Sequence, residues 1–236
     1  MKKVIVFAFI LFVGGIVTYA QKVKPSSNVI TEQRTVLNFS QLVVSNNIEV
    51  VVAFTGTEKI EIQAPDNVIQ YIETVAEKGV LNVRFRKGFK LQGNAAIKVT
   101  VNMKSLIKIV ATNNAKISLE NTLAADKLEV QLNNAALTGN IAVQKASFTL
   151  AKGAKANLSG TCKELKMNLS GASTMGTTSL TADIVEAKLN GQCTARITIN
   201  QSLEFNGAKG SNLYYLGNPK IKGIKASGDS GLFRAD

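Results

Sequence analysis

Apolar and polar residues alternate along most of this chain, and after residue 111 a short triplet interrupts the alternation every 18 to 21 residues. Strict alternation places every second side chain on one face of a β-strand. Seven triplets at so even a spacing predict the stacked rungs of an all-β, parallel β-helix-like solenoid with a period of about 19 residues. The triplets are Thr112-Asn113-Asn114, Asn133-Asn134-Ala135, Ala151-Lys152-Gly153, Ser170-Gly171-Ala172, Asn190-Gly191-Gln192, Ala208-Lys209-Gly210 and Ser227-Gly228-Asp229.

The positions counted back from each triplet predict which side chains face inward. Positions −1, −3 and −5 are apolar in nearly every rung, as Leu132, Val130 and Leu128 illustrate. Ile107 and Lys222 hold position −5 in the first and last rungs. Positions −2 and −4 are mostly polar, which predicts a flat hydrophilic face. An apolar residue usually returns five residues after the start of a triplet, and this predicts a second strand beyond each corner.

The triplets themselves fit tight corners. Asn, Gly and Ser tolerate left-handed backbone dihedrals at little steric cost, and small corner residues let successive rungs stack at the strand spacing. Pairs such as Asn113-Asn114 are therefore interpreted as structural before they are interpreted as functional.

The segment from residue 36 to 105 is also β-rich, but it lacks the triplet. One short helix is expected in it, capped by Asp66 and ended by Lys78-Gly79, with Val68, Ile72 and Val75 on one face. An uncovered rung exposes unpaired backbone groups, so this region is expected to cap the N-terminal end of the solenoid. The expected strands are Gln41–Val44, Ile48–Ala53, Ile60–Gln63, Val80–Phe85 and Ile97–Val101.

Residues 1–20 have the three parts of a secretory signal peptide. Lys2 and Lys3 precede an apolar run from Val4 to Val17, and Thr18-Tyr19-Ala20 resembles a cleavage site before Gln21. The apolar run is shorter than the roughly 20 residues of a membrane-spanning helix, so no membrane span is expected after cleavage. Four segments follow: 1–20 signal peptide, 21–35 a polar lead-in expected to be disordered, 36–105 the β-rich N-terminal capping region, and 106–236 the β-solenoid of about seven rungs.

The chain carries a net charge of +12, which falls by two when Lys2 and Lys3 are removed. Such a charge favours anionic partners such as acidic glycans or lipid headgroups, whereas nucleic acid is a poor partner for an exported chain. The densest basic stretch alternates with Phe85 and Phe89, and it fits either an anion-binding site or an ordinary strand with a solvated face. Its candidate ligand-binding residues are Arg84, Arg86, Lys87 and Lys90.

Candidate catalytic and metal sites are sparse. The chain has no His, which excludes imidazole bases and His-ligated zinc. Glu186 and Glu204 are predicted neighbours on successive rungs beside Lys166, an arrangement that fits a carboxyl with a raised pKa or simply an exposed strand column. Cys162 and Cys193 occupy different phases of the coil and are expected to stay unpaired, although export permits a disulfide. No catalytic residue, cofactor or metal site is predicted.

Several segments resemble one known family. The run from Leu165 to Ser173, Leu-Lys-Met-Asn-Leu-Ser-Gly-Ala-Ser, is similar to the repeat of head GIN domain proteins, which are named as autotransporter adhesins. Ala64-Pro65-Asp66-Asn67, Lys87-Gly88-Phe89 and the run from Val99 to Leu106 match in the same order. The resemblance implies a β-helix-like fold, export and a role in adhesion, and it transfers no catalytic residue.

Three classes of function stay open. The first is an adhesin-like, non-catalytic protein of the periplasm, the outer membrane surface or the extracellular space that binds a glycan or a surface protein. The second is an envelope scaffold that self-associates end to end through the strand edge at Gly231–Asp236. The third is a polysaccharide-cleaving β-helix enzyme, which requires clustered acids, whereas the acids of this chain are scattered.

Overall fold

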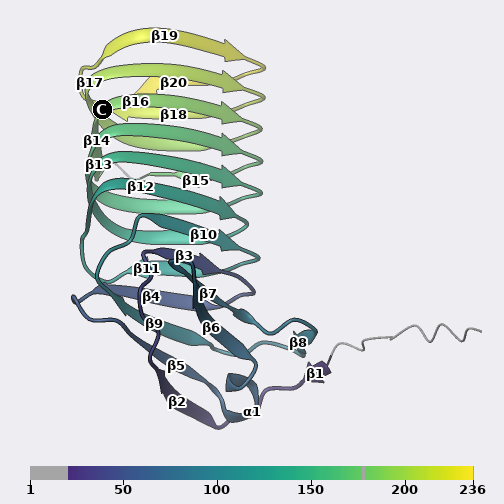
Figure 1. Cartoon of the computed structure of the whole chain (residues 1–236). Coiled ribbons are helices and arrows are strands. Elements are labelled where there is room, and N and C mark those ends of the chain that lie inside the picture. Colours follow the sequence, from purple (N-terminus) through teal and green to yellow (C-terminus); the bar gives the residue numbers. More distant parts are fainter. Residues whose placement is uncertain (1–20, 177–178, 236) are drawn as a thin grey trace, which may run out of the picture.

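The computed structural model describes residues 21–176 and 179–235. The chain forms a stack of β-strands that rises from an N-terminal unit to an open C-terminal rung (Figure 1). The predicted all-β solenoid is confirmed. The predicted signal peptide lies outside the described residues.

The solenoid consists of strands that pair in parallel with the strand one rung further along. One ladder follows the run before each triplet, through β10, β12, β13, β14, β16, β17 and β19, and the other follows the run after it. The strands are β10 (Lys108–Thr112), β11 (Lys116–Leu119), β12 (Leu123–Asn133), β13 (Ala136–Ala151), β14 (Lys155–Ser170), β15 (Thr174–Met175), β16 (Leu180–Asn190), β17 (Thr194–Ala208), β18 (Asn212–Leu216), β19 (Lys220–Ser227) and β20 (Gly231–Arg234).

The triplets are corners with left-handed backbone, as predicted. In most of them the second and third residues both have positive φ, for example Asn113 at 55° and Asn114 at 62°. The corner at Asn133-Asn134-Ala135 has one such residue, Asn134. It is one residue shorter than its neighbours, so the buried side chain after it belongs to Leu137 and not to residue 138.

The inward columns are confirmed along the middle of the coil and differ at its two ends. In the first rung, Ile107 at position −5 is 45% exposed and Leu106 is buried in its place. In the last rung, a β-bulge sets Ile221 opposite Leu203 and leaves Lys222 without a register partner. The prediction that position −5 faces inward was therefore wrong for Lys222, because the bulge shifts the apolar column by one residue to Ile221.

Glycine is required where two rungs approach most closely. A side chain at Gly160 would overlap the carbonyl oxygen of Ile141, and one at Gly176 would overlap the carbonyl oxygen of Arg196. Both glycines also have positive φ, at 105° and 94°. They lie outside the triplets, where the absence of a side chain permits this close approach of backbone.

The parallel stacking extends into the N-terminal unit. Strand β3 (Gln41–Val44) pairs in parallel with β10, and β4 (Glu49–Phe54) pairs with β11. Between β3 and β4, Asn46 and Asn47 have positive φ, so Ser45-Asn46-Asn47 forms a corner of the same kind as those of the solenoid. The statement that this segment lacks the triplet was wrong. The next strands in the stack are β7 (Val80–Phe85) and β9 (Lys98–Met103).

Antiparallel strands close this end of the stack. Strand β5 (Lys59–Pro65) pairs with β9 and with β2 (Val29–Arg34), and β6 (Ile72–Glu77) pairs with β7. The predicted helix is only α1 (Asp66–Ile69). The residues that were expected to continue this helix form strand β6 instead. Lys78 and Gly79 both have positive φ and form the two-residue turn of the hairpin between β6 and β7. The expectation of a helix through Val75 was wrong.

The lead-in is ordered from residue 21. Strand β1 (Gln21–Val23) pairs in parallel with β8 (Phe89–Leu91), and β2 joins the antiparallel sheet. The Arg34 guanidinium donates hydrogen bonds to the carbonyl oxygens of Ile69 and Ile72. It therefore ties β2 to the segment that leads into β6, and the expectation of disorder in residues 21–35 was wrong.

Candidate functional site

The small β1–β8 sheet, which projects from the side of the N-terminal unit (Figure 1), joins two basic segments. Lys22 is the register partner of Lys90. Residues 22–24 and 84–90 hold six Lys and Arg and no acidic residue. All six side chains are exposed. This basic cluster consists of Lys22, Lys24, Arg84, Arg86, Lys87 and Lys90.

One carboxylate is shared by the two arginines of the basic cluster. Glu73 Oε2 lies 3.2 Å from Arg84 Nε, and Glu73 Oε1 lies 3.7 Å from Arg86 Nε. Within the described part of the chain, none of the four lysines forms an ion pair with a side chain. The cluster therefore keeps an excess of positive charge on the small sheet and the residues beside it.

Three aromatic rings pack together beneath the basic cluster. The Phe89 ring stacks on Tyr71 at 4.5 Å between centroids and lies 4.8 Å from Phe85. The backbone N–H of Arg86 donates to the carbonyl oxygen of Tyr71. Phe85 and Phe89 pack against the hydrophobic core, whereas the basic side chains between and beside them are exposed to solvent. The alternation of aromatic and basic residues is therefore explained by the packing of the two strands.

The predicted hydrophilic face is lined with ion pairs. We use the term charged face for the solvent-exposed side of the ladder that runs through β10, β12, β13, β14, β16, β17 and β19. Its pairs are Lys108–Glu129 at 2.9 Å, Lys145–Glu164 at 3.0 Å, Lys166–Glu186 at 3.2 Å and Lys188–Glu186 at 2.9 Å.

Glu186 and Glu204 are register partners on this face, as the sequence predicted. Hydrogen bonds from Lys188 and then Lys166 lower the pKa of the Glu186 carboxyl. The interpretation of a raised pKa at this pair was wrong for Glu186, because the two lysines favour its charged form. A general acid needs a raised pKa, whereas the pKa of Glu186 is lowered, so Glu186 is poorly suited to that role.

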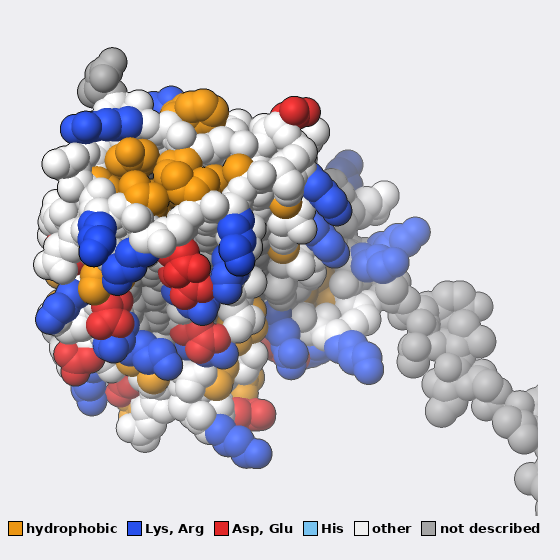
Figure 2. Space-filling view, turned by 90° about the horizontal axis from the view of Figure 1, so that it is seen from above, with side chains coloured by type: hydrophobic (Ala, Val, Ile, Leu, Met, Phe, Trp, Pro, Cys, Tyr) orange, Lys and Arg blue, Asp and Glu red, His pale blue; other side chains and the backbone are white. Residues whose placement is uncertain are grey.

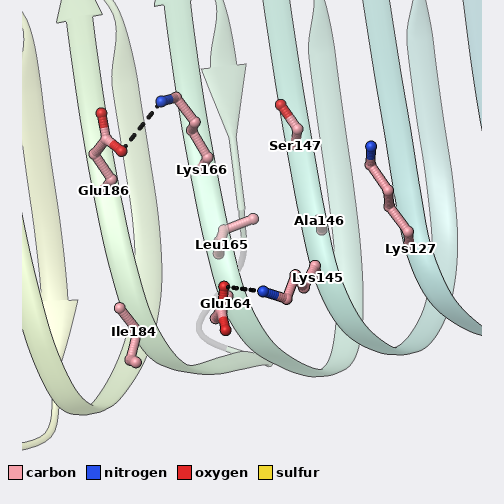
Figure 3. A pocket seen from close by; sticks show the side chains of 9 residues that line it. All are labelled: Lys127, Lys145, Ala146, Ser147, Glu164, Leu165, Lys166, Ile184 and Glu186. Carbon is pink, nitrogen blue, oxygen red and sulfur yellow. Dashed lines mark hydrogen bonds and ion pairs between the residues drawn. The ribbon is translucent and has the colours of Figure 1, made fainter.

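A shallow hollow of about 270 Å³ interrupts the charged face. Ala146 and the buried Leu165 form its floor, and the small side chain of Ser147 leaves space between Lys127 and Lys166 (Figure 3). The ion pairs Lys145–Glu164 and Lys166–Glu186 cross it from rung to rung. The sequence pattern indicated a flat face, whereas the short side chain of Ser147 stands in register between Glu129 and Lys166 and leaves the hollow.

The two cysteines are free, as expected, and both are buried. Burial raises the pKa of the Cys162 thiol to about 11. Within residues 21–176 and 179–235, no cluster of three or more His, Cys, Asp or Glu side chains is placed to hold a metal ion. No helix in this part of the chain has the length and apolar character needed to cross a membrane.

Comparisons with known proteins give one family and several similar folds. A family model described as "Putative auto-transporter adhesin, head GIN domain" matches residues 38–219. No curated protein matches the sequence significantly.

Three crystal structures share the fold at low sequence identity. A "putative adhesin" from Bacteroides fragilis NCTC 9343 is 21% identical, with a TM-score of 0.81 over 90% of this chain and 100% of its own. A "putative adhesin" from Parabacteroides merdae ATCC 43184 is 18% identical, with a TM-score of 0.68 over 92% and 100%. A "putative lipid binding protein" from Parabacteroides distasonis ATCC 8503 is 13% identical, with a TM-score of 0.70 over 92% and 100%. At these identities the likeness shows the fold alone.

Proposed function

Because this chain belongs to the head GIN domain family, whose model matches residues 38–219, we propose that it is an exported, adhesin-like binding protein without catalytic activity. Its ligand is an anionic glycan, and the basic cluster is the binding surface. The name of the family supports the role in adhesion, and the signal-like sequence of residues 1–20 supports export.

The pairing of Lys22 with Lys90 is the observation that carries the choice of ligand. It brings together two basic segments that lie far apart in the sequence, and among the described residues only Glu73 forms ion pairs with them. Like charges in register repel each other, so this arrangement costs stability unless an anion lies between them. A polyanionic chain satisfies several lysines at once, which favours it over a small anion.

The charged face supports the absence of catalysis. Glu129, Glu164 and Glu186 are engaged in ion pairs with lysines, and Glu186 is held in its charged form. Glycoside hydrolysis needs one carboxylic acid that stays protonated near neutral pH. In this proposal the face is therefore a solvated surface that keeps the coil soluble.

The test is the retention of purified protein on an immobilised sulfated polysaccharide, with uncharged dextran as the neutral comparison. Lys87→Glu/Lys90→Glu reverses two charges of the basic cluster and is expected to weaken binding about tenfold or more. Lys155→Glu/Lys163→Glu changes the net charge equally on exposed positions of β14 and is the matched control. Binding of the parent protein should weaken as salt is added.

Two results would contradict the proposal. Equal losses in the cluster variant and in the control would show that net charge alone causes retention. Equal retention on dextran would remove the preference for an anionic glycan. Protease treatment of intact cells tests the location separately, since a strictly periplasmic protein would stay protected and could not act as an adhesin.

A further inference from the structure

The last rung of the solenoid leaves the apolar interior uncovered. Ile224 is the register partner of the fully buried Phe205, yet it is 55% exposed. Phe233 is 46% exposed at the same end. Seen along the coil from this end, hydrophobic side chains gather in a patch, and Lys and Arg side chains lie around it together with a few Asp or Glu side chains (Figure 2). The rung therefore resembles a layer of the core with its outer neighbour missing.

The backbone of this rung is also open. Among the strands that the structure describes, β19 pairs only with β17, and β20 pairs only with β18. Their outer edges carry N–H and C=O groups that face no strand. An exposed edge of this kind is a template for one more strand.

The charges of the rung decide which strand fits. Residues 220–234 contain Lys220, Lys222, Lys225 and Arg234 and a single acid, Asp229. Lys225 continues an outward column as the register partner of the exposed Asn206. Lys220 is the register partner of the buried Ser202 and is itself exposed. Lys222 is the extra residue of the bulge. The outward side chains of an added strand would lie beside these lysines.

We propose that the last rung accepts one extended, acidic segment of a partner protein as an additional parallel or antiparallel strand. The segment alternates apolar side chains, which cover Ile221, Ile224 and Ala226, with Asp or Glu side chains beside Lys220 and Lys225. Backbone hydrogen bonds supply affinity, and the alternate side chains supply specificity. A second copy of this chain fits poorly, because the same four basic residues would oppose each other.

Two synthetic peptides test the proposal on the full chain. Each has nine residues with blocked ends, one alternating valine with glutamate and the other alternating valine with lysine. Fluorescence anisotropy is expected to show binding of the glutamate peptide only. A glutamate peptide with proline at alternate positions should bind about tenfold more weakly or not at all, because proline removes the N–H donors that the edge requires.

Charge reversal on the protein provides the complementary test. Lys220→Glu/Lys225→Glu is expected to reverse the preference toward the lysine peptide, and Lys155→Glu/Lys163→Glu should leave it unchanged. Lys87→Glu/Lys90→Glu should also leave it unchanged, so this result is independent of the glycan test. The proposal is overturned if neither peptide binds, or if the proline peptide binds equally. It is also overturned if the chain dimerises and Ile224→Glu abolishes the dimer, since a second copy would then be the occupant.

Discussion

Lys22 of β1 lies directly opposite Lys90 of β8, so two positive charges face each other across a two-stranded sheet. Lys22→Glu would turn this repulsion into an attraction. The β1–β8 pairing should gain about 0.2–1 kcal/mol, which slower amide hydrogen exchange in β1 and β8 would reveal. The same change should weaken binding to a sulfated polysaccharide, because it removes one cation and adds an anion.

Lys22→Gln is the matched control for this prediction. It removes the repulsion without creating an attraction, so both effects should be intermediate. If Lys22→Glu slowed exchange and left polysaccharide binding unchanged, Lys22 would belong to the sheet but not to the binding surface.

A second prediction concerns the close approach of rungs at Gly160. A methyl group there would overlap the carbonyl oxygen of Ile141, whereas one at Gly153 would meet no atom within 4 Å. Gly153 has a φ of 72°, so Gly153→Ala should cost only the left-handed strain of about 1–2 kcal/mol. Gly160→Ala should cost about 3 kcal/mol or more or prevent folding, as measured by urea denaturation. Equal losses in the two variants would show that the rungs can separate at no cost.

The sequence predicted the solenoid well because each rung repeats the same physical requirement. Inward columns must be apolar and corners must tolerate left-handed backbone, so the pattern returns at each turn. The corner at Ser45-Asn46-Asn47 was missed because the hairpin of β6 and β7 and the strands β5 and β9 separate it from the next corner, which breaks the period.

Other features depend on contacts between distant residues. Val68, Ile72 and Val75 have helical spacing, but pairing of Ile72 and Thr74 with β7 outweighs it. The basic stretch at Arg84 to Lys90 was visible in the sequence, whereas the contribution of Lys22 was not, because it depends on the pairing of β1 with β8. The hollow beside Ser147 likewise depends on which residues four successive rungs place side by side.

A third prediction concerns Arg34, which joins β2 to the segment around α1. Its guanidinium donates to the carbonyl oxygens of Ile69 and Ile72 and to the Thr74 hydroxyl. Arg34→Ala should lower the free energy of unfolding by about 1.5–3 kcal/mol, the usual range for hydrogen bonds to a charged group. Arg34→Lys should restore only part of this loss, because an ammonium cannot reach the carbonyl oxygens with the same fork geometry. A loss in Arg34→Ala no larger than in Lys155→Ala, an exposed control, would contradict it.

A fourth prediction concerns the buried thiol of Cys162. Its pKa of about 11 leaves about one thiol in a thousand ionised at pH 8, whereas an ordinary cysteine is ionised to a substantial fraction. Labelling of Cys162 with a maleimide in the Cys193→Ala background should therefore be about two orders of magnitude slower in the folded protein than in urea. The intact mass should not change on reduction, since both cysteines are free. Rapid labelling of the folded protein at pH 8 would show that the strands around Cys162 unfold locally at little cost and expose the thiol.

The last prediction concerns the pH dependence of the charged face. Hydrogen bonds from Lys188 and Lys166 lower the pKa of Glu186 below its value in the unfolded chain. The stabilisation is therefore complete above the unfolded pKa and is lost as the pH falls through the folded pKa. Glu186→Gln should cost at most about 1 kcal/mol at pH 7, because the pair is partly exposed, and the cost should shrink with added salt. Urea denaturation of both proteins from pH 7 down to pH 3 should show their stabilities converging as Glu186 becomes protonated. A difference that stayed constant over this range would mean that the glutamate acts through packing and not through its charge.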